Sequence, residues 1–435
     1  MWLGLCGLVV LSVRGYVLLF CGVLFVLLGV AGIGWPYTLL VGSMLVSLVY
    51  LVGRLGSRYE ASLDNILVER SFSRNPVFEG SDVDVVIGVG DRGGYGIPLL
   101  RIIDEPPYRV RVSGEPVVET TLPRLSSTSG SYRVRPCMGM HSFEYITLVA
   151  QDSFRLYSSW RRLRVSGRLR AYPVYSGLAE ALRRTTNVWF GGVKTRYRRG
   201  VGYDLYELRE YVPGDDYRRI VWTAFARTGK LFVREDETES YIKIHLILDF
   251  SRESWAGLGC DCGVDHIGRA ALSIIAGLLG RNDRVGYTIY RGDRWVIRTG
   301  LKPYTALDKL STDLSLQSIK YSSTRVRLYR MLLESIRASP DSIIIILSSW
   351  GLMRRDHVEA LAKALAMTSK PKILLYIIPV TSGIEKIASL EAEYLRKYTG
   401  VLHGAGIIPV VARGWEWAGV GLKVVGEVLA RYALY

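Results

Sequence analysis

Two long runs without a charged side chain, residues 15–33 and 35–53, constrain the fold of this chain more than any other feature. Each run has 19 residues, close to the roughly 20 that an α-helix needs to cross about 30 Å of hydrocarbon. Glycines and a proline separate the two runs, and both residue types interrupt helices. We therefore predict that residues 1–58 form a transmembrane helical hairpin that anchors the protein.

The basic residues beside the two runs predict the orientation of this hairpin. Arg14 precedes the first run, and Arg54 and Arg58 follow the second. Because basic residues collect on the cytoplasmic side, we expect a cell-membrane protein with two spans and both termini in the cytoplasm. A cleaved signal peptide is the alternative, but residues 1–13 lack a basic start and a second span would be unexplained. The sequence leaves open whether residues 1–13 belong to the membrane segment.

Residues 60–165 carry the pattern of an all-β domain. Asp82–Val89 alternates polar and apolar side chains, which is typical of a strand with one buried face. Turn-forming clusters recur after short strand-like stretches, as they do in sandwich folds. We predict a β-sandwich domain, and core packing accounts for its apolar pattern without any catalytic chemistry.

Residues 166–240 are interpreted as a basic connector. Between Arg155 and Arg234 there are 18 Lys or Arg against six Asp or Glu, a net charge of +12 out of +16 for the whole chain. Aromatic side chains lie among the basic runs, so residues 155–199 could bind anionic lipid, an acidic protein partner or nucleic acid. We favour a solvated basic face and do not expect a nucleic-acid partner.

Residues 241–435 alternate between apolar runs and helical patterns. Five apolar runs have the length and composition of strands buried on both faces: Ile242–Phe250, Val285–Tyr290, Ile343–Ser348, Ile373–Val380 and Ile407–Val411. Helical patterns lie between or after them: Val264–Leu279, Arg325–Ala338, Arg355–Met367, Ile384–Tyr398 and Trp417–Tyr432. This alternation predicts a doubly wound α/β domain, whose ligands would lie at the carboxyl ends of its parallel strands.

The stretch Tyr203–Thr238 has clear local signals. Pro213-Gly214 predicts a tight turn, and either of the two aspartates that follow can cap a helix over residues 217–228. Gly229 is placed to end that helix in the left-handed conformation.

The same stretch resembles the signature of the domain of unknown function 58 family. Members are membrane-anchored proteins with a von Willebrand factor A-like domain, so the resemblance implies this fold for residues 241–435. The runs that match the signature are Leu208–Asp216, Arg218–Trp222 and Ala226–Leu231, and the family's other motifs match Ser12–Gly15, Asn75–Gly80 and Asp152–Leu156.

The family resemblance also implies partners. Members are typically encoded beside MoxR-type AAA+ ATPases and other von Willebrand A-domain proteins. The implied role is that of an adaptor or scaffold in protein maturation or remodelling. We carry six signature residues over as a partner-binding patch: Glu210, Asp215, Asp216, Arg218, Trp222 and Arg227. The alternative is that these charged residues lock a local structure.

A metal site is the second feature that the resemblance implies. Von Willebrand A-type domains often bind Mg²⁺ through Asp-x-Ser-x-Ser after the first strand and an Asp after a later strand. Asp249 and Ser251 match this pattern, but Glu253 takes the third position and Ser349 stands where the later Asp is expected. We expect a degenerate site of Asp249, Ser251 and Glu253, with Mg²⁺ bound weakly or not at all, and no other cofactor. The cysteines of the Cys260–Cys262 loop are expected as reduced thiols, because Cys-x-Cys alone is a weak zinc signal.

No catalytic motif is found in the sequence. A phosphate-binding loop, a Gly-x-Ser-x-Gly elbow and a His-Glu-x-x-His helix are all missing. We therefore predict no enzymatic activity and no catalytic residues, so that any ATP hydrolysis comes from a partner. Two alternatives are a metal-dependent enzyme using Asp249, Glu253 and the pair Asp215/Asp216, and a lipid- or nucleic-acid-binding module at residues 155–199.

Overall fold

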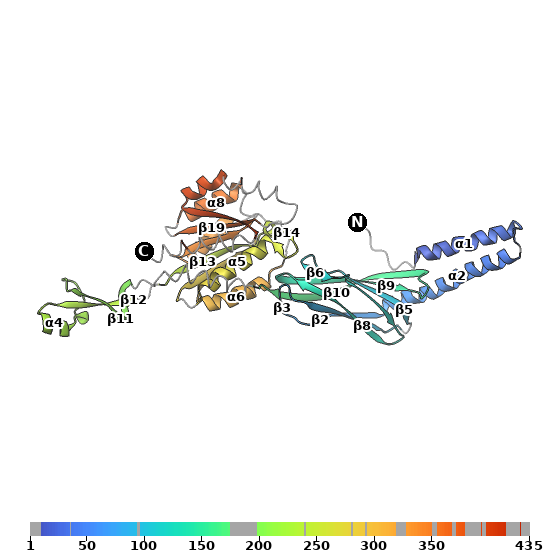
Figure 1. Ribbon diagram of the computed structural model, residues 1–435, viewed down its shortest axis with the longest axis horizontal. Helices are drawn as coiled ribbons and strands as arrows, with labels where there is room; N and C mark the ends of the chain where they lie inside the picture. Colours follow the sequence, from blue (N-terminus) through green and yellow to red (C-terminus); the bar gives the residue numbers. More distant parts are fainter. Residues whose placement is uncertain are drawn as a thin grey trace. The chain divides into compact units, whose positions relative to one another are not determined.

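The computed structural model in Figure 1 describes most of the chain. The described residues are 10–34, 36–93, 96–174, 198–238, 241–279, 282–291, 294–318, 328–349, 355–367, 371–378 and 397–414, with Glu393 and Glu427. They fall into two compact units, Met1–Tyr172 with Ser315–Ser318, and Pro173–Leu314 with Ile319–Tyr435.

Two apolar helices open the first unit, as predicted. Helix α1 (Val13–Val30) and the first 18 residues of α2 (Tyr37–Asp64) are long and apolar enough to cross a membrane, with mean hydropathies of 2.3 and 1.5. Helix α2 has 28 residues, about 42 Å of length. It therefore continues past the expected boundary at residue 58 and ends only at the strand that follows.

Small residues let the two helices approach closely. Gly22 and Gly29 of α1 are buried against α2, where a Cβ atom would lie 3.0 Å from the side chain of Val46 and 2.5 Å from that of Leu39. A Cβ atom at Gly42 of α2 would lie 2.7 Å from the backbone nitrogen of Val26 and 2.8 Å from the carbonyl oxygen of Gly22. Such close backbone contact is typical of helix pairs in membranes, and the heptad spacing of Gly22 and Gly29 is a sequence signal for it.

The β-domain of the first unit is a sandwich of two sheets, which confirms the strand-rich prediction. One sheet has the order β1-β10-β9-β5-β7, with β3 also paired to β10, and the other has the order β2-β4-β8-β6. The strands of the first sheet are β1 (Val10–Leu11), β3 (Val77–Phe78), β5 (Ile97–Asp104), β7 (Val117–Leu122), β9 (Gly139–Gln151) and β10 (Tyr157–Tyr172). Those of the second are β2 (Ile66–Phe72), β4 (Val83–Asp91), β6 (Val110–Ser113) and β8 (Ser127–Pro136).

Alternation along the strands builds the core between the sheets. Every second residue of β4 from Val83 to Asp91 is buried, and Val85 and Ile87 join Ile102 and Leu148 of the facing sheet in one apolar cluster. Hydrophobic burial of this inner face is the main stabilising contribution to the domain.

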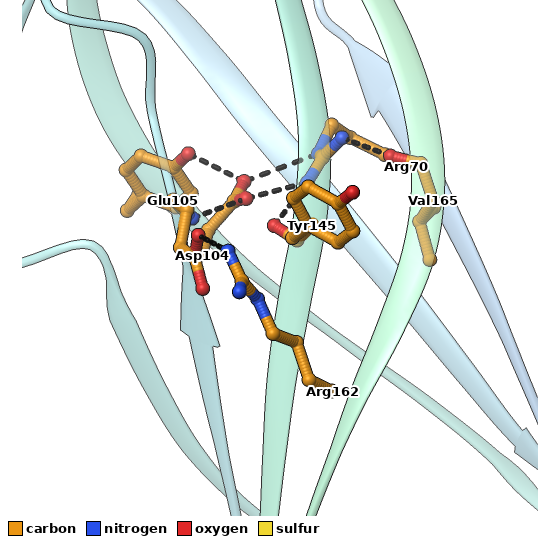
Figure 2. Close-up of polar contacts among 7 residues, drawn as sticks. Arg70, Asp104, Glu105, Tyr145, Arg162 and Val165 are labelled. Carbon is orange, nitrogen blue, oxygen red and sulfur yellow. Dashed lines mark hydrogen bonds and ion pairs between the residues drawn. The ribbon is translucent and has the colours of Figure 1, made fainter. Parts of the chain in front are cut away.

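A buried polar cluster also links the two sheets (Figure 2). Arg70 of β2 donates from Nη2 to Asp104 Oδ1 of β5 at 2.5 Å and from Nε to Asp104 Oδ2 at 3.1 Å, and both side chains have no exposed surface. The guanidinium also donates to the carbonyl oxygens of Tyr145 and Val165. The hydroxyl of Tyr132 donates to Asp104 at 2.6 Å, and burial raises the pKa of that hydroxyl. The charges are thus satisfied inside the core.

Strand β10 changes the expected domain boundary. It pairs with β9 from Ser158 to Ala171, so residue 165 lies inside the sandwich. The basic runs 161–164 and 168–170 therefore belong to a strand of the β-domain and not to a connector. Residues 160–168 of β10 alternate between exposed and partly buried positions. Several of these positions carry arginines, so charge and not the strand pattern led to the interpretation as a connector. Of the basic run at residues 194–199, the first four residues lie outside the described residues, and Arg198 and Arg199 begin strand β11 (Arg198–Glu210).

The signature stretch of the second unit forms a β-hairpin. Strands β11 (Arg198–Glu210) and β12 (Phe232–Thr238) pair in antiparallel register, for example Glu210 with Phe232. Between them lie a 3₁₀ turn, η1 (Tyr217–Arg219), and helix α4 (Trp222–Thr228).

The remainder of the second unit holds a six-stranded sheet of order β17-β16-β13-β18-β19-β20. The five expected strands are present and parallel: β13 (Lys243–Asp249), β16 (Arg284–Tyr290), β18 (Ile343–Ser348), β19 (Lys372–Ile378) and β20 (Ile407–Arg413). Strand β17 (Trp295–Leu301) was not predicted and pairs with β16 in antiparallel fashion. It is half exposed, so it lacks the continuous apolar run of its neighbours.

Helices accompany this sheet. Helices α7 (Leu328–Ala338) and α8 (Arg355–Leu365) pack on the face that carries Ile247, Ile344 and Ile346. Helix α5 (Gly263–Gly277) contributes nothing to that cluster but contacts β13, β18 and β19. Helix α6 (Pro303–Ser315) was not predicted. The expected helix over residues 417–432 and most of that over 384–398 lie outside the described residues.

Candidate functional site

Asp215 of the signature is bound within the hairpin itself. Its carboxylate accepts two hydrogen bonds from the Arg209 guanidinium, at 2.7 and 2.6 Å, and one from the backbone N–H of Val212 at 2.9 Å. The Arg209 guanidinium, with the Val212 N–H, lowers the pKa of the Asp215 carboxyl. Asp215 therefore closes the turn that contains Gly214, whose φ of 111° suits glycine.

Asp216 is the capping residue that the sequence left undecided between two positions. Its Oδ1 accepts a hydrogen bond from the Arg218 N–H at 3.0 Å, at the start of η1. The predicted continuous helix over 217–228 is wrong, because Ile220 forms a bridge with Val233 and interrupts it. The predicted stop at Gly229 is confirmed by its left-handed φ of 71°.

Glu210 completes the acidic part of the signature. It forms an ion pair with Lys230, which lies between α4 and β12, with Nζ 2.6 Å from Oε1, and this pair raises the pKa of Lys230. All three acidic residues are therefore engaged by other groups of the hairpin, which agrees with the local-structure interpretation of these positions.

The basic and aromatic members of the signature have a different environment. Trp222 is 62% exposed and Tyr217 is 66% exposed, and Phe225 stands edge-on to Trp222 with ring centroids 6.3 Å apart. Arg218 and Arg227 are exposed, and within the described residues neither forms an ion pair with a carboxylate. We call Tyr217, Arg218, Trp222, Phe225 and Arg227 the hairpin tip. Tyr217 and Phe225 were not among the site residues predicted from the sequence. The closeness of these two aromatic residues to Trp222 in the sequence could have indicated an aromatic cluster.

Asp249 lies at the carboxyl end of β13, beside the point where the strand order reverses between β13 and β18. It accepts hydrogen bonds from the Ser251 N–H at 3.0 Å and the Ser348 hydroxyl at 2.8 Å. Burial raises the pKa of the Asp249 carboxyl, and the hydrogen bonds from Ser251 and Ser348 oppose this only in part. Burial disfavours the charged form of a carboxyl group, so Asp249 favours its neutral form despite these hydrogen bonds.

The surroundings of Asp249 do not fit a Mg²⁺ ion, which prefers several oxygen ligands including carboxylates. Glu253 lies in the 3₁₀ turn η2 (Arg252–Trp255) and is exposed, whereas Ser251 is buried beside Asp249. Ser349, which stands where the later Asp is expected, is buried against the start of α5, since a Cβ atom at Gly263 would lie 2.5 Å from its hydroxyl oxygen. Among the described residues, no group of three or more His, Cys, Asp or Glu side chains could hold a metal ion.

The loop before α5 is held by its own polar contacts. Asp265 accepts a hydrogen bond from the Cys262 N–H at 3.0 Å, and His266 Nε2 lies 2.7 Å from Asp261 Oδ1. Cys262 is a buried free thiol, whereas Cys260 is disulfide-bonded. The expectation of two reduced thiols is therefore wrong for Cys260.

Comparison with known proteins supports the family resemblance. A family model described as "Protein of unknown function DUF58" matches residues 207–306, from the hairpin to the start of α6. No curated protein matches the chain.

Solved structures show only weak likeness. The conserved hypothetical protein BatB from Bacteroides thetaiotaomicron is 16% identical, with 45% of this chain and 100% of that chain covered, at a TM-score of 0.30. The CARDB domain of the PF1109 protein from Pyrococcus furiosus is 15% identical, with 23% and 91% covered, at a TM-score of 0.15. These scores carry no argument about fold or function.

Proposed function

We propose that this chain is a membrane-anchored adaptor or scaffold whose hairpin tip docks a cytoplasmic partner protein. The observation that carries the proposal is that the acidic residues of the signature and the residues of the hairpin tip have different environments. The acidic residues bind other groups of the hairpin, including Arg209, while the aromatic and arginine residues of the hairpin tip stay exposed. Tryptophan, tyrosine and arginine are the residues that most often dominate binding energy at protein interfaces.

The partner we propose, by family resemblance, is a MoxR-type AAA+ ATPase. The sequence holds no recognised ATP-binding motif, so we infer that a partner supplies the energy of ATP hydrolysis. The exposed arginines of the hairpin tip favour an acidic docking surface on that partner, since charge complementarity guides association.

We also propose that the α/β domain is von Willebrand A-like. Its strand order, with one antiparallel edge strand, β17, supports this interpretation. Asp249 at the end of the first strand supports it too, as a position that retains its carboxyl group but serves packing and hydrogen bonding instead of metal binding.

The proposed topology has both termini and all residues after α2 in the cytoplasm. Arg14, Arg54 and Arg58 at one end of the two helices support it. Protease added to sealed right-side-out vesicles should leave residues 60–435 intact. Digestion of this portion without lysis would reverse the orientation.

Co-purification tests the docking role. The full chain is isolated from its native membrane as wild type, Trp222→Ala, Arg227→Ala and, as control, Tyr304→Ala, which removes another exposed aromatic side chain. We expect at least a tenfold loss of the co-purifying ATPase for Trp222→Ala, the effect of a binding hot spot, with unchanged melting. Equal recovery from all four chains would remove the hairpin tip as the docking site.

A further inference from the structure

The turn between β9 and β10 presents an apolar side chain on a rigid backbone. Asp152 accepts hydrogen bonds from the N–H groups of Phe154 at 2.9 Å and Tyr157 at 2.7 Å, and its carbonyl oxygen accepts one from Arg155 N–H at 2.9 Å. Phe154 takes part in these hydrogen bonds only through its backbone N–H, and the residue is 66% exposed. The turn thus holds a phenylalanine in the open at the end of a strand pair.

Helix α1 fixes the level of this turn along the membrane segment. The Ser12 N–H donates to the carbonyl oxygen of Leu156 at 2.7 Å, and the Ser12 hydroxyl donates to that of Arg155 at 2.5 Å. A Cβ atom at Gly15 would lie 2.6 Å from the same Leu156 oxygen. Because the first candidate span begins at Val13, the turn lies beside its first residues.

Helix α2 places the turn at the same level independently. A Cβ atom at Gly53 would lie 2.6 Å from the hydroxyl oxygen of Tyr157. The second candidate span covers Tyr37–Arg54, so Tyr157 touches its last turn. Both helices therefore contact residues 156–157 where their apolar spans meet the polar part of the chain, and Figure 1 shows them leaving the sandwich at this end.

The chemistry of this level is that of the lipid headgroup region. Arg14 and Arg58 are exposed on the two helices, and Arg155 follows Phe154 on the turn. Aromatic and basic side chains are the residues that anchor proteins at a membrane interface. An exposed phenylalanine in this position can bury its ring among acyl chains close to the headgroups, which is favourable by the hydrophobic effect.

We propose that the turn at residues 152–157 is a third membrane contact, in which the Phe154 ring inserts into the headgroup boundary of a phospholipid bilayer. The proposal rests on the membrane anchoring in the proposed function. Together with the two helices, this contact fixes the tilt of the sandwich against the membrane surface. The Phe154 ring is not needed to hold the turn, because the hydrogen bonds of Asp152 already close it.

Phe78 of β3, which pairs with the far end of β10, is a matched control for Phe154. Phe78 is 61% exposed and pairs with Tyr172 at the other end of β10, whereas Leu11 pairs with Tyr157 at the turn. Fifteen strand residues separate these two ends, which corresponds to about 50 Å. A probe at position 78 is therefore equally exposed but lies far from the proposed contact.

The experiment uses the full chain in phosphatidylcholine–phosphatidylglycerol nanodiscs. An environment-sensitive fluorescent amino acid replaces Phe154 in one chain and Phe78 in the other, and lipids with acyl chains brominated near the headgroup are the quencher. We expect at least threefold stronger quenching at position 154 than at position 78. Equal quenching at the two positions would overturn the contact, because position 154 would then lie no closer to the acyl chains than position 78.

Alkaline carbonate extraction of membranes containing the same chains separates the two ideas. A chain that stays in the membrane pellet but shows no quenching at position 154 overturns only the contact. Release of the chain into the supernatant overturns the anchoring itself. The melting temperature of each labelled chain should equal that of the wild type, because neither ring takes part in the hydrogen bonds of its turn or strand.

Discussion

Asp104→Asn should destabilise the β-sandwich strongly. The substitution keeps the size of the side chain but leaves the Arg70 guanidinium charged, buried and without its counter-charge, since neither side chain has exposed surface. The carbonyl oxygens of Tyr145 and Val165 still accept hydrogen bonds from Arg70 (Figure 2), but they carry no full charge. The Tyr132 hydroxyl keeps an oxygen acceptor at best.

The size of the effect follows from burial. Removing one partner of a buried ion pair costs about 3–5 kcal/mol. In a domain of this size, 1 kcal/mol shifts the melting temperature by about 4–8 °C, so a fall of more than roughly 10 °C is expected. An apolar replacement of the whole cluster, Arg70→Met with Asp104→Leu and Tyr132→Phe, should recover most of that loss, because no charge or hydroxyl is then left unpaired in the core.

Thermal melts of the full chain in detergent micelles measure this difference, with hydrogen exchange of β2 and β5 peptides assigning the transition to the sandwich. The control is Asp82→Asn, which removes an exposed ion pair with Arg135, whose Nε lies 2.7 Å from Asp82 Oδ1. No measurable shift of the melting temperature is expected for this variant. The reasoning fails if Asp104→Asn melts like the wild type, or if the apolar triple variant is as unstable as the single one.

Three further predictions concern other parts of the chain. Burial lowers the pKa of His245 from 6.5 to about 4. The unfolded chain therefore takes up a proton below about pH 6.5 that the folded chain accepts only near pH 4, and stability should fall as pH drops, by about 2 kcal/mol at pH 5. Urea titrations at pH 7 and pH 5 should show this loss in the wild type and a smaller one in His245→Gln. Gly42→Val should separate α1 from α2, since even a Cβ atom would lie 2.7 Å from the Val26 nitrogen; a weaker cross-link yield between cysteines placed on the two helices would show it, with Ser43→Val as an exposed control. Asp249→Asn should melt at or above the wild-type temperature, because burial already favours the neutral carboxyl group, and calorimetry should detect no tight Mg²⁺ or Mn²⁺ binding; micromolar binding abolished by this substitution would contradict the fit argued above.

The signature region shows how far local signals reach. Pro213-Gly214 and Gly229 predicted the turn and the helix stop, because both depend on backbone conformations that few other residues adopt. The helix between them was predicted too long, since Ile220 pairs with a strand residue thirteen positions later. A contact of that kind overrides helix propensity and leaves no trace in the local sequence.

The sequence by itself predicted two helices long and apolar enough to cross a membrane, a strand-rich domain after them and the five parallel strands of the α/β domain. Hydropathy and periodicity are properties of consecutive residues, and each of these elements must bury the face that its pattern marks as apolar. The degenerate character of the Asp249 region was also readable, because it depends on which residue type stands at each position.

Only the tertiary structure decided which residues meet. Arg70 and Asp104 are 34 positions apart, and Ser12 and Arg155 are 143 positions apart, so neither the buried ion pair nor the contact between α1 and the β9–β10 turn could be predicted from local patterns. The same holds within the signature, where the pairing of β11 with β12 brings Lys230 to Glu210. Long-range contacts depend on how whole elements pack, and packing is what pairs the acidic residues of the signature with other groups of the hairpin, while the side chains of the arginines and aromatic residues of its tip keep no such partners among the described residues.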